Sequence, residues 1–123
     1  RMKSDLLPLL LAAAQGDLRT APKLEWDTRA AVCVVLASAG YPASSHKGDV
    51  ISGLEHVAAM PDVFVFHAGT ALQDSEFVTA GGRVLGVTAL GDSIAAARER
   101  AYEAVEKIHF SGIQVRTDIA AGV

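Results

Sequence analysis

The chain has 123 residues, half of them hydrophobic and a fifth charged, which is typical of one soluble globular domain. Its formal net charge of −3 gives no basic excess of the kind that binds nucleic acid or a membrane surface, so we expect neither partner. The single cysteine, Cys33, cannot form an internal disulfide, which favours a reducing, cytoplasmic setting.

The first predicted element is a helix over about residues 5–15, in "DLLPLLLAAAQ". Ser4 or Asp5 can cap its start, and Gly16 can end it in the left-handed conformation. Apolar residues surround this helix on nearly all sides, so we expect it to be buried against another element. The chain enters this helix almost at once and without an initiator methionine, which predicts a cut through a longer protein.

The segment after this helix, "RTAPKLEWD" at residues 19–27, is polar and contains a proline, so it predicts a linker. Trp26 is expected to anchor the linker where it enters the next domain. The apolar run "TRAAVCVVLASAG" at residues 28–40 predicts a central strand. Cys33 within it can be a nucleophile or a small buried residue, and we favour burial because unpaired cysteine packs like a hydrophobic residue.

A turn-rich loop follows at residues 41–49, and a turn of helix is predicted near Glu55 to Ala59. Three strands are then predicted over residues 63–67, 76–79 and 83–90, with a hairpin turn at Gln73 and Asp74. The expected arrangement of the three strands is an antiparallel meander.

A second helix is predicted over about residues 93–109, with Asp92 or Ser93 as its N-cap. Its apolar stripe has helical spacing and consists of Ile94, Ala97, Ala101, Val105 and Ile108. A last strand is predicted over about residues 113–117. The expected fold is therefore α+β, with a mostly antiparallel sheet covered by a helix on one face and preceded by an N-terminal helix.

The step from Gly82 to Arg83 is the principal candidate binding feature. Arginine binds phosphate or carboxylate at two points, and glycines before it permit positive φ and a close approach of ligand to the backbone. Strand alternation predicts that Arg83 shares a core-facing row with Leu85 and the apolar residues beyond it. A charge there needs an anionic ligand or an acid such as Asp74 or Asp118, and the residues alone leave both open.

His67 and Lys47 are two further candidates. His67 ends a predicted strand before small residues and can be structural or bind ligand, while Lys47 in the loop can contact an anion or remain solvated. The histidines lack metal-ligand spacing, the serines lack a nucleophile elbow, and no phosphate-binding glycine loop is present. We therefore expect no catalytic residue and no metal site within this chain.

Several segments together resemble one enzyme family: "LASAGYPASSHKGDVISG", "VFHAGTAL", "VTAGGRVLGVTALGDSIAAARERAYEAVEKI" and "VRTDI". In this order and spacing they are similar to the C-terminal domain of glycinamide ribonucleotide synthetase, also called phosphoribosylamine–glycine ligase. The opening "RMKSDLLPLLLAAAQGDL" resembles the last helix of that enzyme's ATP-grasp region. The resemblance divides the chain into a terminal helix and linker at residues 1–23 and a C-terminal domain at residues 24–123.

The resemblance implies part of the ATP-dependent ligase that joins glycine to 5-phosphoribosylamine in purine biosynthesis, giving glycinamide ribonucleotide, ADP and phosphate. It implies that upstream ATP-grasp domains of the same chain bind ATP and Mg²⁺ or Mn²⁺, so this part alone is expected to be inactive. The same resemblance implies that this part closes the active site and contacts the phosphoribosyl substrate through Arg83, Gly82, His67 and Lys47. Family members often have an aromatic residue where Ser45 stands, and glycine where Ala120 stands.

Two alternatives remain open at this point. One is a free-standing α+β module that binds a small ligand or regulates, without catalysis. The other is a purely structural lid of the same ligase, in which Arg83 contacts no ligand.

Overall fold

A four-stranded antiparallel sheet forms the centre of the protein in the computed structural model, which describes residues 1–123. Its order is β2-β5-β1-β6, and its strands are β1 (Ala30–Ala37), β2 (Val63–His67), β5 (Arg83–Gly91) and β6 (Gln114–Val115). The helices are α1 (Leu6–Ala14), α2 (Leu54–Ala58) and α3 (Ile94–Val105). This arrangement confirms the predicted α+β fold. No helix combines the length and apolar character that a bilayer crossing requires.

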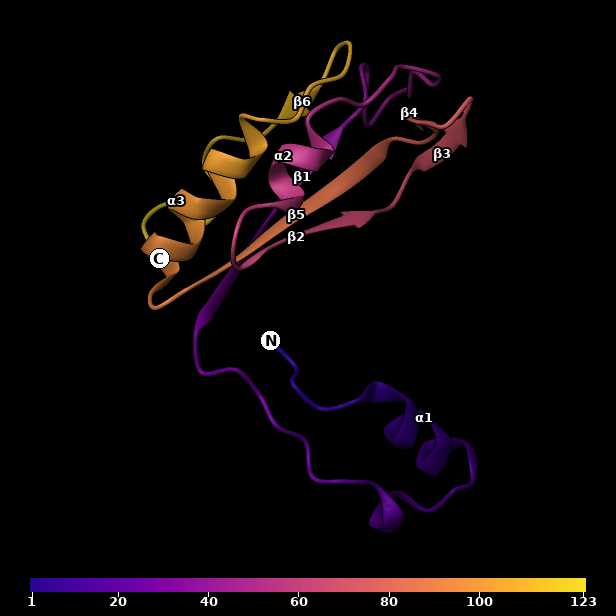
Figure 1. Ribbon diagram of the computed structural model, residues 1–123, viewed down its shortest axis with the longest axis vertical. Coiled ribbons are helices and arrows are strands. Elements are labelled where there is room, and N and C mark those ends of the chain that lie inside the picture. Colours follow the sequence, from indigo (N-terminus) through magenta and orange to yellow (C-terminus); the bar gives the residue numbers. More distant parts are fainter.

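The predicted three-stranded meander is wrong. β2 pairs directly with β5, from Val63 opposite Ala89 to His67 opposite Leu85. The segment between them forms a separate hairpin of β3 (Thr70–Gln73) and β4 (Glu76–Thr79), seen beyond the end of β2 in Figure 1. Asp74 and Ser75 both adopt positive φ at its turn, which folds β4 back onto a segment where no strand was predicted.

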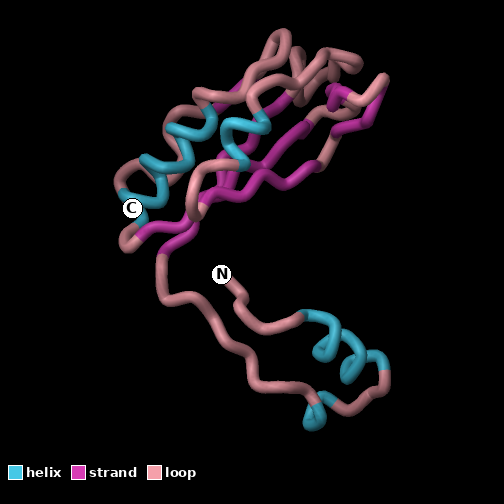
Figure 2. The backbone as a smooth tube through the Cα atoms, in the orientation of Figure 1, coloured by secondary structure: helices cyan, strands magenta, loops and turns pink.

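The hydrophobic core lies between one face of the sheet and the helices α2 and α3 (Figure 2). Ser93 caps α3 by accepting a hydrogen bond from the Ala96 N–H at 3.1 Å, as predicted. The buried side of α3 is formed by small residues that let the helix approach the sheet closely: Ala97, Ala101 and Ala104. Ile94 is 37% exposed, so its predicted place in the apolar stripe is wrong.

The opposite face of the sheet, here called the open face, has no layer over it. Val35, Phe64 and Phe66 are 43%, 51% and 60% exposed there. Cys33 is also exposed, and its predicted burial is therefore wrong. The reason is strand alternation, because Val34 and its even-numbered neighbours occupy the core side of β1.

Residues 1–27 form an arm that extends away from the sheet (Figure 1, indigo to violet). Its base is closed by backbone hydrogen bonds from Lys3 N–H to the Glu25 carbonyl and from Asp27 N–H to the Arg1 carbonyl, at 2.9 and 2.7 Å. Asp5 caps α1 through the Leu7 N–H at 2.9 Å. Gly16 follows the helix with φ +75°, as predicted.

The predicted burial of α1 and of Trp26 is not found in this chain. The helix leucines are between 45% and 69% exposed at Leu6, Leu7, Leu10 and Leu11. Trp26 is 56% exposed and therefore does not anchor the linker. No other part of the 123 residues covers this apolar surface.

Ala120 provides a test of local backbone strain, because it has φ +56°, which a Cβ disfavours. We expect Ala120→Gly to raise the free energy of unfolding by about 0.5–1 kcal/mol. The matched control is Ala121→Gly, at an exposed neighbour without positive φ, which should lower it by about 0.5 kcal/mol. Urea denaturation measures both, and a shift in the same direction for the two variants contradicts the strain.

Candidate functional site

Arg83 lies on the open face because β5 contains a β-bulge beside it. Leu36 of β1 is opposite Leu85, but the next residue, Ala37, is opposite Arg83, so Val84 is the extra residue. The bulge interrupts strand alternation between Arg83 and Leu85. The predicted core-facing row that included Arg83 is therefore wrong, although the apolar part of the row from Leu85 onward is buried.

The guanidinium of Arg83 makes no hydrogen bond and no ion pair within the chain. Of the two acids considered as partners, Asp74 forms no ion pair, and Asp118 pairs with Arg116 at 2.6 Å. Hydrogen bonds from Arg116 hold the pKa of the Asp118 carboxyl below its usual value. Arg83 is left as an unpaired cation on the open face.

A cavity of about 590 Å³ surrounds this arginine. Val35 and Phe66 give it an apolar wall, Tyr41 and Gly82 border it, and Arg83 is the only charged residue among those that line it. A fixed cation beside apolar walls suits a ligand with one anionic end, because partial removal of water strengthens the charge interaction.

The glycines before Arg83 are needed for close packing. A Cβ on Gly82 would lie 2.5 Å from Cδ2 of Tyr41, and one on Gly81 would lie 3.2 Å from Cα of Gly69. Neither Gly81 nor Gly82 has positive φ, so the conformational reason predicted for them is wrong. The Gly-Gly step lets the Tyr41 ring and the Gly69 backbone lie against the start of β5.

His67 lies on the other face of the sheet from Arg83. Its Nδ1 is 3.0 Å from the hydroxyl oxygen of Thr70, and its ring centroid is 4.5 Å from that of Phe77. It borders a small apolar hollow next to α2, and Lys47 is exposed in the 41–49 loop. Of the four predicted binding residues, the structure brings together Gly82 and Arg83 but not His67 or Lys47.

Tyr41 is the residue of this cavity that sequence reasoning missed. Its N–H donates to the Ser38 carbonyl at 3.2 Å, and the Ser38 N–H donates to the Gly82 carbonyl at 2.9 Å. These two hydrogen bonds link the loop after β1 to Gly82, the residue before Arg83. The available signal was an aromatic residue in a turn directly after the strand that pairs with Arg83.

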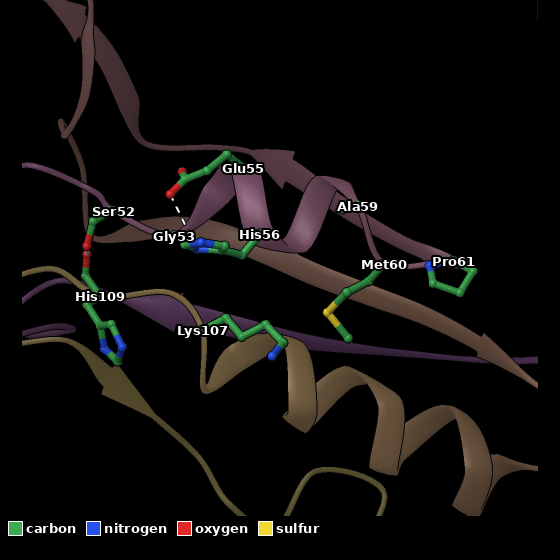
Figure 3. Close-up of a pocket in the computed structure, with 9 residues that line it drawn as sticks. All are labelled: Ser52, Gly53, Glu55, His56, Ala59, Met60, Pro61, Lys107 and His109. Carbon is green, nitrogen blue, oxygen red and sulfur yellow. Dashed lines mark hydrogen bonds and ion pairs between the residues drawn. The ribbon is translucent and has the colours of Figure 1, made fainter.

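A second hollow, of about 750 Å³, lies between α2 and the end of α3 (Figure 3). It brings His56 near Lys107 and His109, which lie about fifty residues further along the chain. His56 lies 3.3 Å from the carboxylate of Glu55, and both side chains are more than 70% exposed. The hollow is on the helical side of the sheet, so it does not join the Arg83 cavity.

The described side chains do not fit a divalent metal. No group of three or more histidine, cysteine, aspartate or glutamate side chains gathers anywhere in the chain with a geometry that could hold an ion. We therefore derive no chemical step through a metal for these residues.

Comparison with known protein families shows to which family this domain belongs. The model of the family "Phosphoribosylglycinamide synthetase, C domain" matches residues 31–122, which include the whole sheet apart from its first residue. The chain belongs to this family. The matched region contains the bulge, the Arg83 cavity and the hairpin, whereas the arm lies outside it.

Individual relatives of this C domain carry the name phosphoribosylamine–glycine ligase. The chain is 51% identical over 120 residues to the protein from Rhodopirellula baltica and 51% identical over 121 residues to that from Caldanaerobacter subterraneus subsp. tengcongensis. Each alignment covers 98% of this chain and 28% of the relative. The chain thus spans little more than a quarter of the length of the relatives that it matches.

A solved structure shows the same fold. The crystal structure of phosphoribosylamine–glycine ligase from Thermotoga maritima matches with a TM-score of 0.73 and 36% identity. The match covers 93% of this chain and 27% of that protein. The α+β architecture of this C domain therefore occurs within a larger ligase.

The contact between Gly82 and Tyr41 can be tested by a double-mutant cycle. We expect Gly82→Ala to lower the free energy of unfolding by about 1–3 kcal/mol, because the new methyl overlaps the ring. In a Tyr41→Ala background most of this loss should disappear. Gly86→Ala within β5 is the control and should cost less, because its Cβ would meet no atom nearer than Cys33 Sγ at 3.3 Å and Phe66 Cβ at 4.0 Å. Equal losses in both backgrounds, measured by urea denaturation, contradict the packing argument.

Proposed function

We propose that this chain is the C-terminal part of the ATP-dependent ligase that joins glycine to 5-phosphoribosylamine in purine biosynthesis, giving glycinamide ribonucleotide, ADP and phosphate. Support comes from the family match and from relatives that carry this enzyme name. The observation that carries the proposal is the unpaired guanidinium of Arg83 in its cavity on the open face.

The role proposed for Arg83 is to bind the phosphate of the phosphoribosyl substrate. Its guanidinium can form two parallel hydrogen bonds to phosphate oxygens, and no acid of the chain competes for it. Gly82 has no side chain between the backbone and the cavity. A binding role for His67 and Lys47 stays a prediction from sequence, because neither lines this cavity.

The remaining parts of the reaction belong, in this proposal, to other domains of the complete enzyme. Those domains bind ATP and Mg²⁺ or Mn²⁺, since this chain offers no set of metal ligands. They pack against the exposed aromatic residues of the open face and the leucines of α1, so that this domain closes the active site. In this proposal the enzyme acts in the cytoplasm, in keeping with the single cysteine of this chain, which has no disulfide partner within it.

Arg83→Ala in the complete enzyme tests the proposal. We expect the KM for phosphoribosylamine to rise roughly tenfold to hundredfold, because a hydrogen-bonded contact to a charged group contributes about 1.5–3 kcal/mol. The KM for ATP should change little. Steady-state kinetics with each substrate varied in turn measures the difference.

The matched control is Arg100→Ala on α3, which removes an arginine that pairs with Asp62 at 3.2 Å and does not line the Arg83 cavity. It should leave the KM for phosphoribosylamine unchanged. If Arg83→Ala keeps this KM within about twofold, Arg83 is structural and the domain acts only as a lid.

A further inference from the structure

We infer that Tyr41 is a second substrate-binding residue, which contacts the pentose of the phosphoribosyl ligand while Arg83 holds its phosphate. This inference rests on the proposed function and assigns a residue that sequence reasoning did not select. It follows from the position, the fixation and the hydrogen bonding of Tyr41.

The Tyr41 ring stands between two cavities of the open face. It lines the Arg83 cavity and also an adjoining cavity of about 380 Å³ that is formed mainly by apolar residues of β1 and β6. Its side chain packs against Gly82, directly beside Arg83, yet the residue remains 37% exposed. A ligand whose phosphate reaches Arg83 would therefore have this ring as a neighbour.

The backbone around Tyr41 is fixed on both sides. The Ser38 carbonyl accepts from the Tyr41 N–H, and the Ser38 N–H binds the Gly82 carbonyl. The Gln114 side-chain amide, oriented to match its neighbours, donates to the Tyr41 carbonyl at 3.0 Å and accepts from the Gly40 N–H at 2.9 Å. A loop backbone held in this way loses little conformational freedom when a ligand arrives, and it fixes the point from which the ring projects.

The hydroxyl of Tyr41 has no hydrogen-bond partner in the chain, whereas the other tyrosine has two. The Tyr102 hydroxyl donates to the Arg116 carbonyl at 2.7 Å and accepts from the Ile119 N–H at 3.1 Å. Tyr102 thus ties the C-terminal segment to α3. Tyr41 instead presents an unused donor in a cavity whose only charged group, Arg83, is also unpaired.

This pairing of groups matches the chemistry of a pentose phosphate. Such a ligand has one strongly anionic end, for a guanidinium, and a ring that carries both C–H groups and hydroxyls. The face of a tyrosine ring packs against C–H groups, and its hydroxyl can bond to a sugar hydroxyl. Arg83 and Tyr41 together therefore recognise the two halves of one ligand.

The test uses the complete enzyme and the variants Tyr41→Phe and Tyr41→Ala. Tyr41→Phe removes only the hydroxyl, and we expect the KM for phosphoribosylamine to rise about threefold to tenfold, as the loss of one neutral hydrogen bond predicts. Tyr41→Ala also removes the ring and should raise this KM further. The KM values for ATP and glycine should stay within twofold.

Tyr102→Phe is the matched control, because it deletes the same atom from a tyrosine with a structural role. It should lower the melting temperature and leave every KM unchanged, the reverse of the result expected for Tyr41→Phe. Opposite effects of the two variants on KM and on melting temperature separate a binding role from a stabilising one. If Tyr41→Ala does not fold, the KM of Tyr41→Phe alone tests the contact with the pentose.

The outcomes distinguish the inference from the proposed function. If the unsubstituted complete enzyme forms no glycinamide ribonucleotide, both are overturned. If it does, and Arg83→Ala raises the KM while Tyr41→Phe leaves it within twofold, the role of Tyr41 is rejected and the proposed function stands. Equal rises in all three KM values for Tyr41→Phe also reject a contact with the pentose.

Discussion

The extra residue in the pairing of β5 with β1 is the constraint on which the site depends. With regular alternation Arg83 would follow Leu85 into the core, where an unpaired charge would be strongly destabilising. The bulge at Val84 places a buried side chain at that position and leaves Arg83 on the open face. One inserted residue therefore keeps Val84 in the core and places Arg83 on the open face.

Close packing of backbone against backbone then shapes the cavity next to Arg83. Gly81 lies against Gly69, Gly82 lies under the Tyr41 ring, and Ser38 joins the two loops by hydrogen bonds. A Cβ on Gly82 would overlap the Tyr41 ring at 2.5 Å, and one on Gly81 would lie only 3.2 Å from Cα of Gly69, so tight packing gives the cavity a defined shape. In the proposed ligase the exposed aromatic residues around it would be covered when the domains close.

Local signals in the sequence accounted for most elements of the fold. Cap residues such as Ser93, helical spacing on α3 and β-rich apolar runs gave the helices and the main strands, because these signals act between residues a few positions apart. The pairing of the strands was not accessible in this way. A turn with two residues of positive φ pairs β3 with β4 in a hairpin, in place of the expected meander. Hydrophobic periodicity does not reveal which strands pair.

The sequence by itself determined the α+β class, the family resemblance and the choice of Gly82 and Arg83 as a candidate site, since these follow from residue types in a fixed order. Only the tertiary structure decided which side chains share a cavity. It placed His67 on the opposite face from Arg83, exposed Cys33 and brought Tyr41 beside Gly82. The physical reason is that the face and the neighbours of a side chain depend on how strands pair and where a bulge falls, and both are set by segments far apart in the sequence.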